Sequence, residues 1–216
     1  MTRILLVDDY PVVVEGLKRI LAEAIPDADF GVASDGAEAV RLFRATKWHF
    51  VVLDISLPHG RGLELLKQFR AFRPHTPVLV LSMDPEDHFA VRALRAGAAG
   101  YLTKKAAAQE IVKAVRKVRS GGAYVSVALA ERLAHDIRDG TARDPHETLS
   151  DREYIVFRML GTGQTVKEIA TRLGLSPQTI STHRTRLLGK MGMKSNAELV
   201  HYLTHTRLHW GRTSDV

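Results

Sequence analysis

Two hydrophobic patterns alternate along the first 120 residues, and together they predict a doubly wound α/β domain. Short, nearly continuous apolar runs predict strands at 4–7, 30–33, 50–53, 78–81 and 100–103. Between them, apolar residues recur at helical spacing and predict helices at 11–21, 35–45, 63–72, 85–96 and 107–119. Continuous apolar runs are typical of strands that are buried on both faces, so the helices are expected to cross over a five-stranded parallel sheet. The expected strand order is 2-1-3-4-5, which is flavodoxin-like.

The pattern becomes wholly helical after residue 149. Helices are expected at 151–160, 166–173, 177–190 and 196–206. Gly174 ends the second of these, and Ser176 followed by Pro177 caps the third, which is the arrangement of a helix-turn-helix. We therefore divide the chain into an α/β domain at 1–122, an extra helix and linker at 123–148, an all-α helix-turn-helix domain at 149–206 and a tail at 207–216.

Composition excludes several classes of protein. The chain contains no cysteine, so disulfides, thiolate chemistry and cysteine-based zinc sites are ruled out. No run of about 18 apolar residues predicts a membrane span. Asp8 and Asp9 come too early for a signal peptide, so a cytoplasmic protein without a membrane partner is expected. The last 68 residues hold ten Lys and Arg against five Asp and Glu. That excess indicates a polyanion partner, although a solvated basic surface would give the same count.

Candidate chemistry lies just past the ends of the predicted strands, where parallel sheets place their ligands. Asp8, Asp9, Asp54, Ser82 and Lys104 occupy these positions. Three clustered carboxylates repel one another without a cation, and Mg²⁺ prefers such oxygen ligands. A carboxylate beside Mg²⁺ can attack phosphorus, with Lys104 and Ser82 as donors to the phosphoryl oxygens. Asp54 is the most central of the three acids. The alternative is that single aspartates only cap helices, as Asp9 before Pro11 and Asp84 before Pro85 could do.

Residues 1–120 resemble the receiver domain of bacterial two-component response regulators. The resemblance rests on Leu6-Val7-Asp8-Asp9, Val51-Val52-Leu53-Asp54-Ile55-Ser56-Leu57-Pro58, Leu81-Ser82 and Ala96-Gly97-Ala98-Ala99-Gly100-Tyr101-Leu102-Thr103-Lys104-Lys105. It implies that Asp54 is the phosphoacceptor and that Lys104 contacts the phosphoryl group. It implies a Mg²⁺ site made by Asp9, Asp54 and the backbone carbonyl of Ser56, with Asp8 behind them. Ser82 and Tyr101 would form a switch pair. The chain departs from the family pattern at Leu57, at His59-Gly60-Arg61 and at Lys105.

The C-terminal segment resembles the LuxR-type DNA-binding domain, and both matches together resemble the NarL/FixJ response regulators. The matching stretches are Leu149-Ser150-Asp151-Arg152-Glu153, Lys167-Glu168-Ile169-Ala170, Leu175-Ser176-Pro177-Gln178-Thr179-Ile180-Ser181-Thr182-His183 and Leu188-Gly189-Lys190-Met191-Gly192. The resemblance assigns Ser181, Thr182 and Thr185 to the DNA groove. It makes Lys167, Thr179, Arg184 and Arg186 candidates for phosphate contacts. His183 either reads a base or packs between helices.

The expected function is a phosphorylation-regulated transcription factor that binds double-stranded DNA. A sensor histidine kinase would phosphorylate Asp54, and a homodimer would form on phosphorylation; no turnover enzyme is expected. One alternative is an Asp-nucleophile phosphatase, which usually has a second acid where Ser56 stands. Another is a phosphorylation-independent DNA-binding or scaffold protein with a vestigial receiver. His201, His205 and His209 recur every four residues and could face one way on a helix as a metal clasp. Gly211 and the polar tail indicate that a helix would fray there, which favours a solvated or dimer-facing surface.

Overall fold

The computed structural model describes residues 1–83, 86–139 and 144–205. The chain divides into two compact units, Met1–Asp139 and Gly140–Val216, which we describe one at a time. Several expectations fall outside the described residues: the turn at Asp84 and Pro85, part of the linker, His209 and the tail at 207–216. No helix among the described residues has both the length and the apolar character needed to cross a bilayer.

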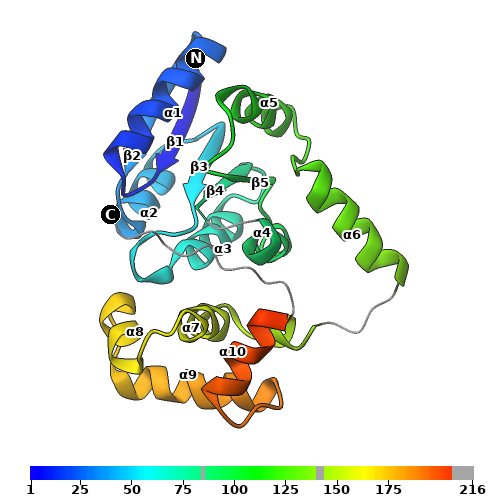
Figure 1. Ribbon diagram of the computed structural model, residues 1–216. Coiled ribbons are helices and arrows are strands. Elements are labelled where there is room, and N and C mark those ends of the chain that lie inside the picture. The colour runs from blue at the N-terminus through cyan, green and yellow to red at the C-terminus, as the bar shows by residue number, and fades with distance from the viewer. Residues whose placement is uncertain (84–85, 140–143, 206–216) are drawn as a thin grey trace. The chain divides into compact units, whose positions relative to one another are not determined.

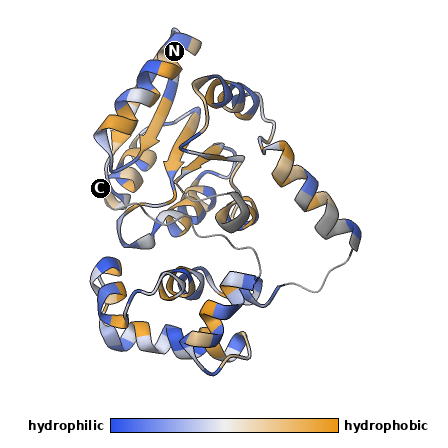
Figure 2. Ribbon diagram, viewed as in Figure 1, coloured by the Kyte–Doolittle hydropathy of each residue, from blue (hydrophilic) through white to orange (hydrophobic). Residues whose placement is uncertain are grey.

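The first unit is built on a parallel sheet whose strand order is β2-β1-β3-β4-β5, so the expected fold is confirmed (Figure 1). Its strands are β1 (Thr2–Val7), β2 (Ala28–Ala33), β3 (Phe50–Asp54), β4 (Val78–Ser82) and β5 (Gly100–Thr103). Apolar residues fill these strands, as Figure 2 shows. In the register of the central strands Val7 lies beside Leu53, and Asp54 beside Leu81.

Helices cover both faces of this sheet. They are α1 (Pro11–Ala24), α2 (Gly36–Ala45), α3 (Gly62–Phe72), α4 (Glu86–Arg95) and α5 (Ala108–Arg119), and a further helix, α6 (Val127–Asp139), follows α5. Because side chains alternate along a strand, Leu6, Val52 and Leu81 face the core shared with α1 and α5. A short 3₁₀ turn, Pro58–Gly60, precedes α3 and was not predicted; His59 has a left-handed backbone there, at φ 65°.

The segment that leaves α5 pairs with the exposed edge of β5. The Tyr124 N–H donates to Ala99 O at 2.9 Å, and the Tyr101 N–H donates to Tyr124 O at 3.2 Å. The Tyr124 hydroxyl also donates to Glu110 Oε1 at 3.3 Å. A Cβ at Gly100 would lie 2.6 Å from Tyr124 O, so glycine is needed for this close approach. Beyond this contact, α6 packs against α4.

The second unit is a bundle of α7 (Asp151–Gly161), α8 (Val166–Leu173), α9 (Pro177–Lys190) and α10 (Asn196–His205). Its helices begin at strong caps. Ser150 and Glu153 form a capping box at α7, and Ser176 accepts from the Thr179 N–H at α9. Gly174 adopts a left-handed backbone, φ 62°, and turns the chain between α8 and α9. The predicted helix-turn-helix is therefore present.

Part of the predicted linker is ordered against this second unit. Pro145–Thr148 forms a 3₁₀ turn, where the sequence indicated only a polar connection. His146 in this turn is buried, and its Nδ1 lies 2.8 Å from the Tyr202 hydroxyl on α10. Burial raises the pKa of Tyr202 to about 12, so the hydroxyl keeps its proton. The Thr148 hydroxyl donates to Pro145 O at 2.7 Å within the turn, but the aromatic contacts of His146 with Phe157 and Tyr202 come from other helices, and the local sequence does not reveal them.

Candidate functional site

The sheet brings the candidate residues of the first unit to one edge. Asp8 and Asp9 follow β1, Asp54 ends β3 and Ser82 ends β4. Lys104 follows β5, and its backbone N–H donates to Ser82 O at 2.7 Å. The parallel register therefore places all five positions at the carboxyl ends of neighbouring strands.

Lys104 lies between two buried carboxylates. Its Nζ is 2.6 Å from Asp8 Oδ2 and 2.8 Å from Asp54 Oδ2. The side chains of Asp8 and Asp54 are only 3% and 1% exposed, so the ion pairs are shielded from water. Carboxylate oxygens of Asp8, Asp9 and Asp54 all lie within 4.8 Å of one another. Three acids and one ammonium leave this cluster with a formal charge of −2.

One oxygen of this cluster has no partner. Among the described residues, Asp9 Oδ1 is buried and accepts no hydrogen bond. A buried acceptor without a donor is costly, and a cation would satisfy it. The oxygen donors and the excess negative charge suit a hard divalent ion such as Mg²⁺. The residues present thus fit a Mg²⁺ site.

The pKa values of Asp54 and Lys104 are both raised, but for different reasons. Burial raises the pKa of Asp54, and the neighbouring Asp8 carboxylate adds to this; bonds from Lys104 and from the Ser56 N–H oppose it. Burial alone would lower the pKa of Lys104, but its bonds to Asp54 and Asp8 outweigh that effect and raise it. Lys104 is therefore a cation at neutral pH, and hydrogen bonds fix the orientation of the neighbouring Asp54 carboxylate.

Two of the remaining receiver candidates, Ser56 and Ser82, lie next to Asp54. The Ser56 N–H donates to Asp54 Oδ1 at 2.8 Å, and the Ser56 and Ser82 hydroxyls are 3.3 Å apart. Tyr101 is fully buried. Sequence reasoning missed Tyr10, whose N–H donates to Asp8 Oδ1 at 2.9 Å and whose ring centroid is 5.3 Å from Lys104 Nζ. Its position directly after the two acids was the available signal.

Helix α9 presents a polar face to solvent. Ser181, Thr182, Thr185 and Arg186 are exposed, as is Lys167 on α8, whereas Thr179 is half-buried. The hydroxyls of Thr182 and Thr185 donate to the backbone carbonyls of Gln178 and Ser181, one turn earlier. Each hydroxyl can rotate toward a ligand, and in doing so it loses its hydrogen bond to the backbone carbonyl.

Two residues of α9 differ from the expected outward arrangement. Arg184 is half-buried, and its Nε donates to Asn196 Oδ1 on α10 at 2.7 Å. The sequence pattern placed it outward because it could not show this contact. His183 Nδ1 is buried and has no hydrogen-bond partner within the described part of the chain. Burial, assisted by Arg186 and Arg152, lowers the pKa of His183 against the opposing pull of Glu153, which suits a neutral packing residue.

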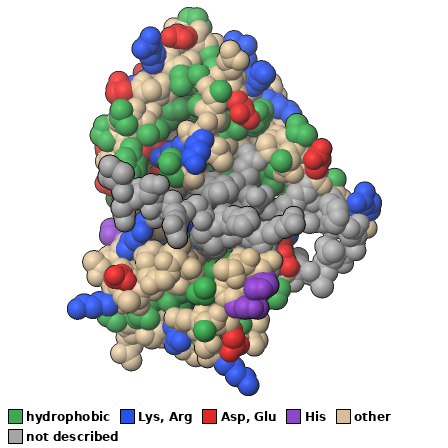
Figure 3. All heavy atoms as spheres, in the orientation of Figure 1, with side chains coloured by type: hydrophobic (Ala, Val, Ile, Leu, Met, Phe, Trp, Pro, Cys, Tyr) green, Lys and Arg blue, Asp and Glu red, His purple; other side chains and the backbone are tan. Residues whose placement is uncertain are grey.

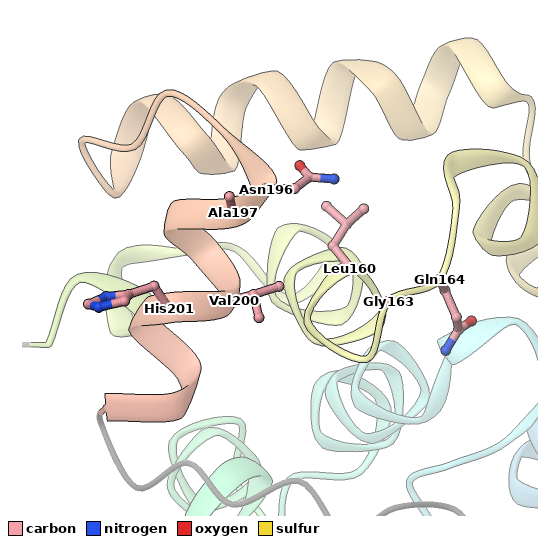
Figure 4. Close-up of a pocket in the computed structure, with 7 residues that line it drawn as sticks. All are labelled: Leu160, Gly163, Gln164, Asn196, Ala197, Val200 and His201. Atoms are coloured by element: carbon pink, nitrogen blue, oxygen red, sulfur yellow. The ribbon is translucent and has the colours of Figure 1, made fainter.

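A shallow groove of about 480 Å³ lies in the second unit, between the end of α7 and α10 (Figure 4). Leu160, Ala197 and Val200 give it an apolar floor, and Gln164 and Asn196 border it. The groove holds none of the predicted site residues.

Comparisons with known proteins agree with this two-part architecture. Residues 4–116 match the response regulator receiver domain, and residues 147–203 match the luxR family of bacterial regulatory proteins. The chain is 35% identical to response regulator UvrY of Escherichia coli K12 over 93% of both chains. It is 35% identical to response regulator GacA of Pseudomonas aeruginosa PAO1, over 92% of this chain and 94% of that one.

A solved structure of RcsB from Salmonella enterica serovar Typhimurium is similar over 94% of this chain and 98% of its own. It has a TM-score of 0.66 and 26% sequence identity, and it is bound to the promoter P1flhDC in the presence of the phosphomimetic BeF₃⁻. A receiver sheet with a buried aspartate, joined to a helix-turn-helix, defines a response regulator that acts on transcription. This chain belongs to that family, in the NarL/FixJ arrangement of a receiver followed by a LuxR-type DNA-binding domain.

Proposed function

We propose that Asp54 accepts a phosphoryl group from a sensor histidine kinase and that this modification controls dimerisation and promoter binding. The observation that carries the proposal is the position of Lys104, 2.8 Å from the buried Asp54 within a cluster of three carboxylates. A structural ion pair needs one acid, and the additional acids are explained by a bound cation and an incoming phosphoryl group.

The proposed step is an in-line displacement at phosphorus. An Asp54 carboxylate oxygen forms the new P–O bond while the P–N bond to the kinase histidine breaks, and the histidine leaves. Lys104 Nζ gives up its contact with Asp54 and donates to a transferred phosphoryl oxygen. The Ser56 N–H orients the carboxylate before attack, because it is bound to the other oxygen, Oδ1.

We infer that Asp9, Asp54 and the Ser56 carbonyl hold Mg²⁺, with Asp8 supporting them. When bound, the ion neutralises negative charge on the phosphoryl oxygens and the carboxylates. The unpartnered Asp9 Oδ1 supports this assignment, since it is the acceptor that lacks a donor.

The proposed switch couples Asp54 to Tyr101. A phosphoryl dianion is a strong acceptor that would draw the Ser82 hydroxyl away from Ser56. Tyr101, buried on β5 beside Val80 of β4, would then repack and shift an equilibrium between two conformations. The RcsB structure holds promoter DNA in the presence of a phosphomimetic, which supports a link between phosphorylation and DNA binding. Promoter DNA as target implies action in the cytoplasm.

The test of phosphorylation uses Asp54→Asn and Asp35→Asn as a matched control. Asp35 caps α2, and asparagine caps equally well, so the control makes the same chemical change at an aspartate outside the carboxylate cluster. Treatment with acetyl phosphate and Mg²⁺ should label the wild type and the control, but not Asp54→Asn. Labelling that persists in Asp54→Asn would assign the acceptor to another residue. Labelling without any change in dimerisation or DNA affinity would favour a vestigial receiver.

We further propose that the protein is not a turnover enzyme. Ser56 stands two residues after Asp54, where an Asp-nucleophile phosphatase would place a second acid for protonating the leaving group. Multiple turnovers of a phosphate monoester by the purified chain would overturn this part of the proposal.

Two substitutions separate the roles proposed for the DNA-binding domain. Lys167 is exposed, and as a phosphate contact it should affect all DNA sequences alike. Lys167→Ala should weaken every complex and lower the slope of log affinity against log salt by about 1. Thr182→Ala should instead change the sequence preference in a randomised-site selection. An unaltered preference would remove Thr182 from the base-reading set.

A further inference from the structure

Two histidines form a pair near the end of α10 and belong to neither of the proposed sites. His201 and His205 are one helical turn apart, and both are exposed. Their imidazole rings stack with centroids 3.9 Å apart and planes inclined at 24°. His201 lines one end of the groove, on the far side of Val200 from Leu160 (Figure 4). Figure 3 shows histidine side chains together at the surface in this part of the molecule.

Hydrogen bonding sets the tautomer of His205. Its Nδ1 lies 2.8 Å from the backbone carbonyl oxygen of His201. A carbonyl can only accept, so Nδ1 carries the proton and Nε2 retains its lone pair. A histidine that binds a metal usually makes this same bond, from its second ring nitrogen to a backbone carbonyl. His205 is thus pre-oriented with a ligating nitrogen free.

The two rings are close enough to be brought to one ion. Two imidazole nitrogens at about 2.05 Å from a tetrahedral ion lie roughly 3.3 Å apart. The ring centroids are 3.9 Å apart, and the exposed side chains must rotate out of the stack so that one nitrogen of each ring points at the ion. Histidines four residues apart on a helix are a known arrangement for binding one metal ion.

We propose that His201 and His205 form a bidentate site for a borderline transition-metal ion, Zn²⁺ or Cu²⁺, on α10. Water completes the coordination of the ion. Imidazole selects these ions over Mg²⁺, which prefers carboxylate and carbonyl oxygens. The site is therefore chemically distinct from the carboxylate cluster of the receiver. The bound ion joins two turns of α10 next to the groove bordered by Asn196 and Val200.

The experiment titrates the full-length chain with CuCl₂ and ZnCl₂ while excess Mg²⁺ occupies the carboxylate cluster. Calorimetry gives the affinity, and ¹H–¹⁵N spectra of the imidazoles identify the ligands, because Cu²⁺ broadens nearby resonances. One equivalent of Cu²⁺ should broaden the signals of His201 and His205 first. His201→Gln and His205→Gln should each lower the affinity by about tenfold or more, since each removes one ligand.

His75→Gln is the matched control, because His75 is an exposed histidine in the other unit. It should leave the affinity unchanged. The proposal is overturned if both α10 variants keep wild-type affinity, or if only one of them loses it, since a bidentate site needs both nitrogens. Both variants change exposed side chains, and their circular dichroism and thermal unfolding should match the wild type in the absence of metal.

Discussion

Asp9→Asn should stabilise the receiver without metal and abolish its stabilisation by Mg²⁺. The carboxylate oxygens of Asp8, Asp9 and Asp54 lie within 4.8 Å of one another. Two unit charges at that distance repel by about 3.5 kcal/mol at an effective dielectric constant of 20. The Lys104 ammonium offsets roughly one of the two repulsions felt by Asp9, and partial exposure of Asp9 screens the remainder. We expect Asp9→Asn to raise the free energy of unfolding by about 1–3 kcal/mol in EDTA.

In the presence of Mg²⁺, the wild type should become more stable to unfolding than Asp9→Asn. An ion that binds only the folded wild type stabilises it by about 1.4 kcal/mol at ten times its dissociation constant, and by about 2.7 kcal/mol at a hundred times. The asparagine variant lacks the anionic oxygen and should show little of this gain. The assay is urea unfolding of both proteins, in EDTA and across a Mg²⁺ series, with Asp35→Asn as the control.

Two results would refute this reasoning. If Asp9→Asn is less stable than the wild type in EDTA, the orphaned oxygen is not a source of repulsion. If Mg²⁺ stabilises both proteins equally, the ion binds somewhere other than the carboxylate cluster. Asp35→Asn should follow the wild type in every condition, because its cap to the Glu38 N–H is retained.

The remaining predictions concern packing around the two units. Burial alone would raise the pKa of Glu153, but the Lys190 ammonium and the capping bonds hold it below its usual value. The stabilisation that these bonds give the fold is therefore present above pH 4.5, and it is lost as pH falls through the lowered pKa. Glu153→Gln should therefore cost about 1–2 kcal/mol at pH 7, and the difference should shrink in unfolding measurements below pH 4.5. Gly100→Ala would place a Cβ 2.6 Å from Tyr124 O and should destabilise the first unit by about 1–3 kcal/mol; unchanged amide exchange at Tyr124 would contradict this. Arg73→Lys loses a guanidinium that bonds backbone carbonyls at the end of α2, and chemical unfolding should show a loss of about 1–2 kcal/mol.

The sheet, and the candidate site at the carboxyl ends of its strands, could be predicted from the sequence. The strands are marked by local apolar runs, and the position of the site follows from the strand order. The apolar runs ending at Asp54 and Ser82 identify strands, and the strand order then brings Asp9, Asp54 and Lys104 together. No contact had to be known in advance, since the carboxyl ends of parallel strands always share an edge. The roles assigned to these residues stay predictions until the substitutions above are made.

Other features depend on contacts that no short pattern encodes. The turn around His146 exists because Tyr202, 56 residues away, bonds to it. Arg184 has the spacing of an outward residue on α9, yet Asn196 binds it from the next helix. Tyr124 pairs with β5 through its backbone N–H and carbonyl, which nearly every residue type has. The residues around Tyr124 therefore show no pattern that predicts a strand.

The pairing of Tyr124 with β5 has a practical consequence for preparing the receiver alone. A fragment that stops at residue 122 would end before this strand-like contact and uncover the amide of Tyr101 and the carbonyl of Ala99. An open sheet edge invites other chains to add to it, so such a fragment should self-associate. A cut placed after Asp139, where the contact division falls, keeps the edge covered and leaves α6 packed on α4.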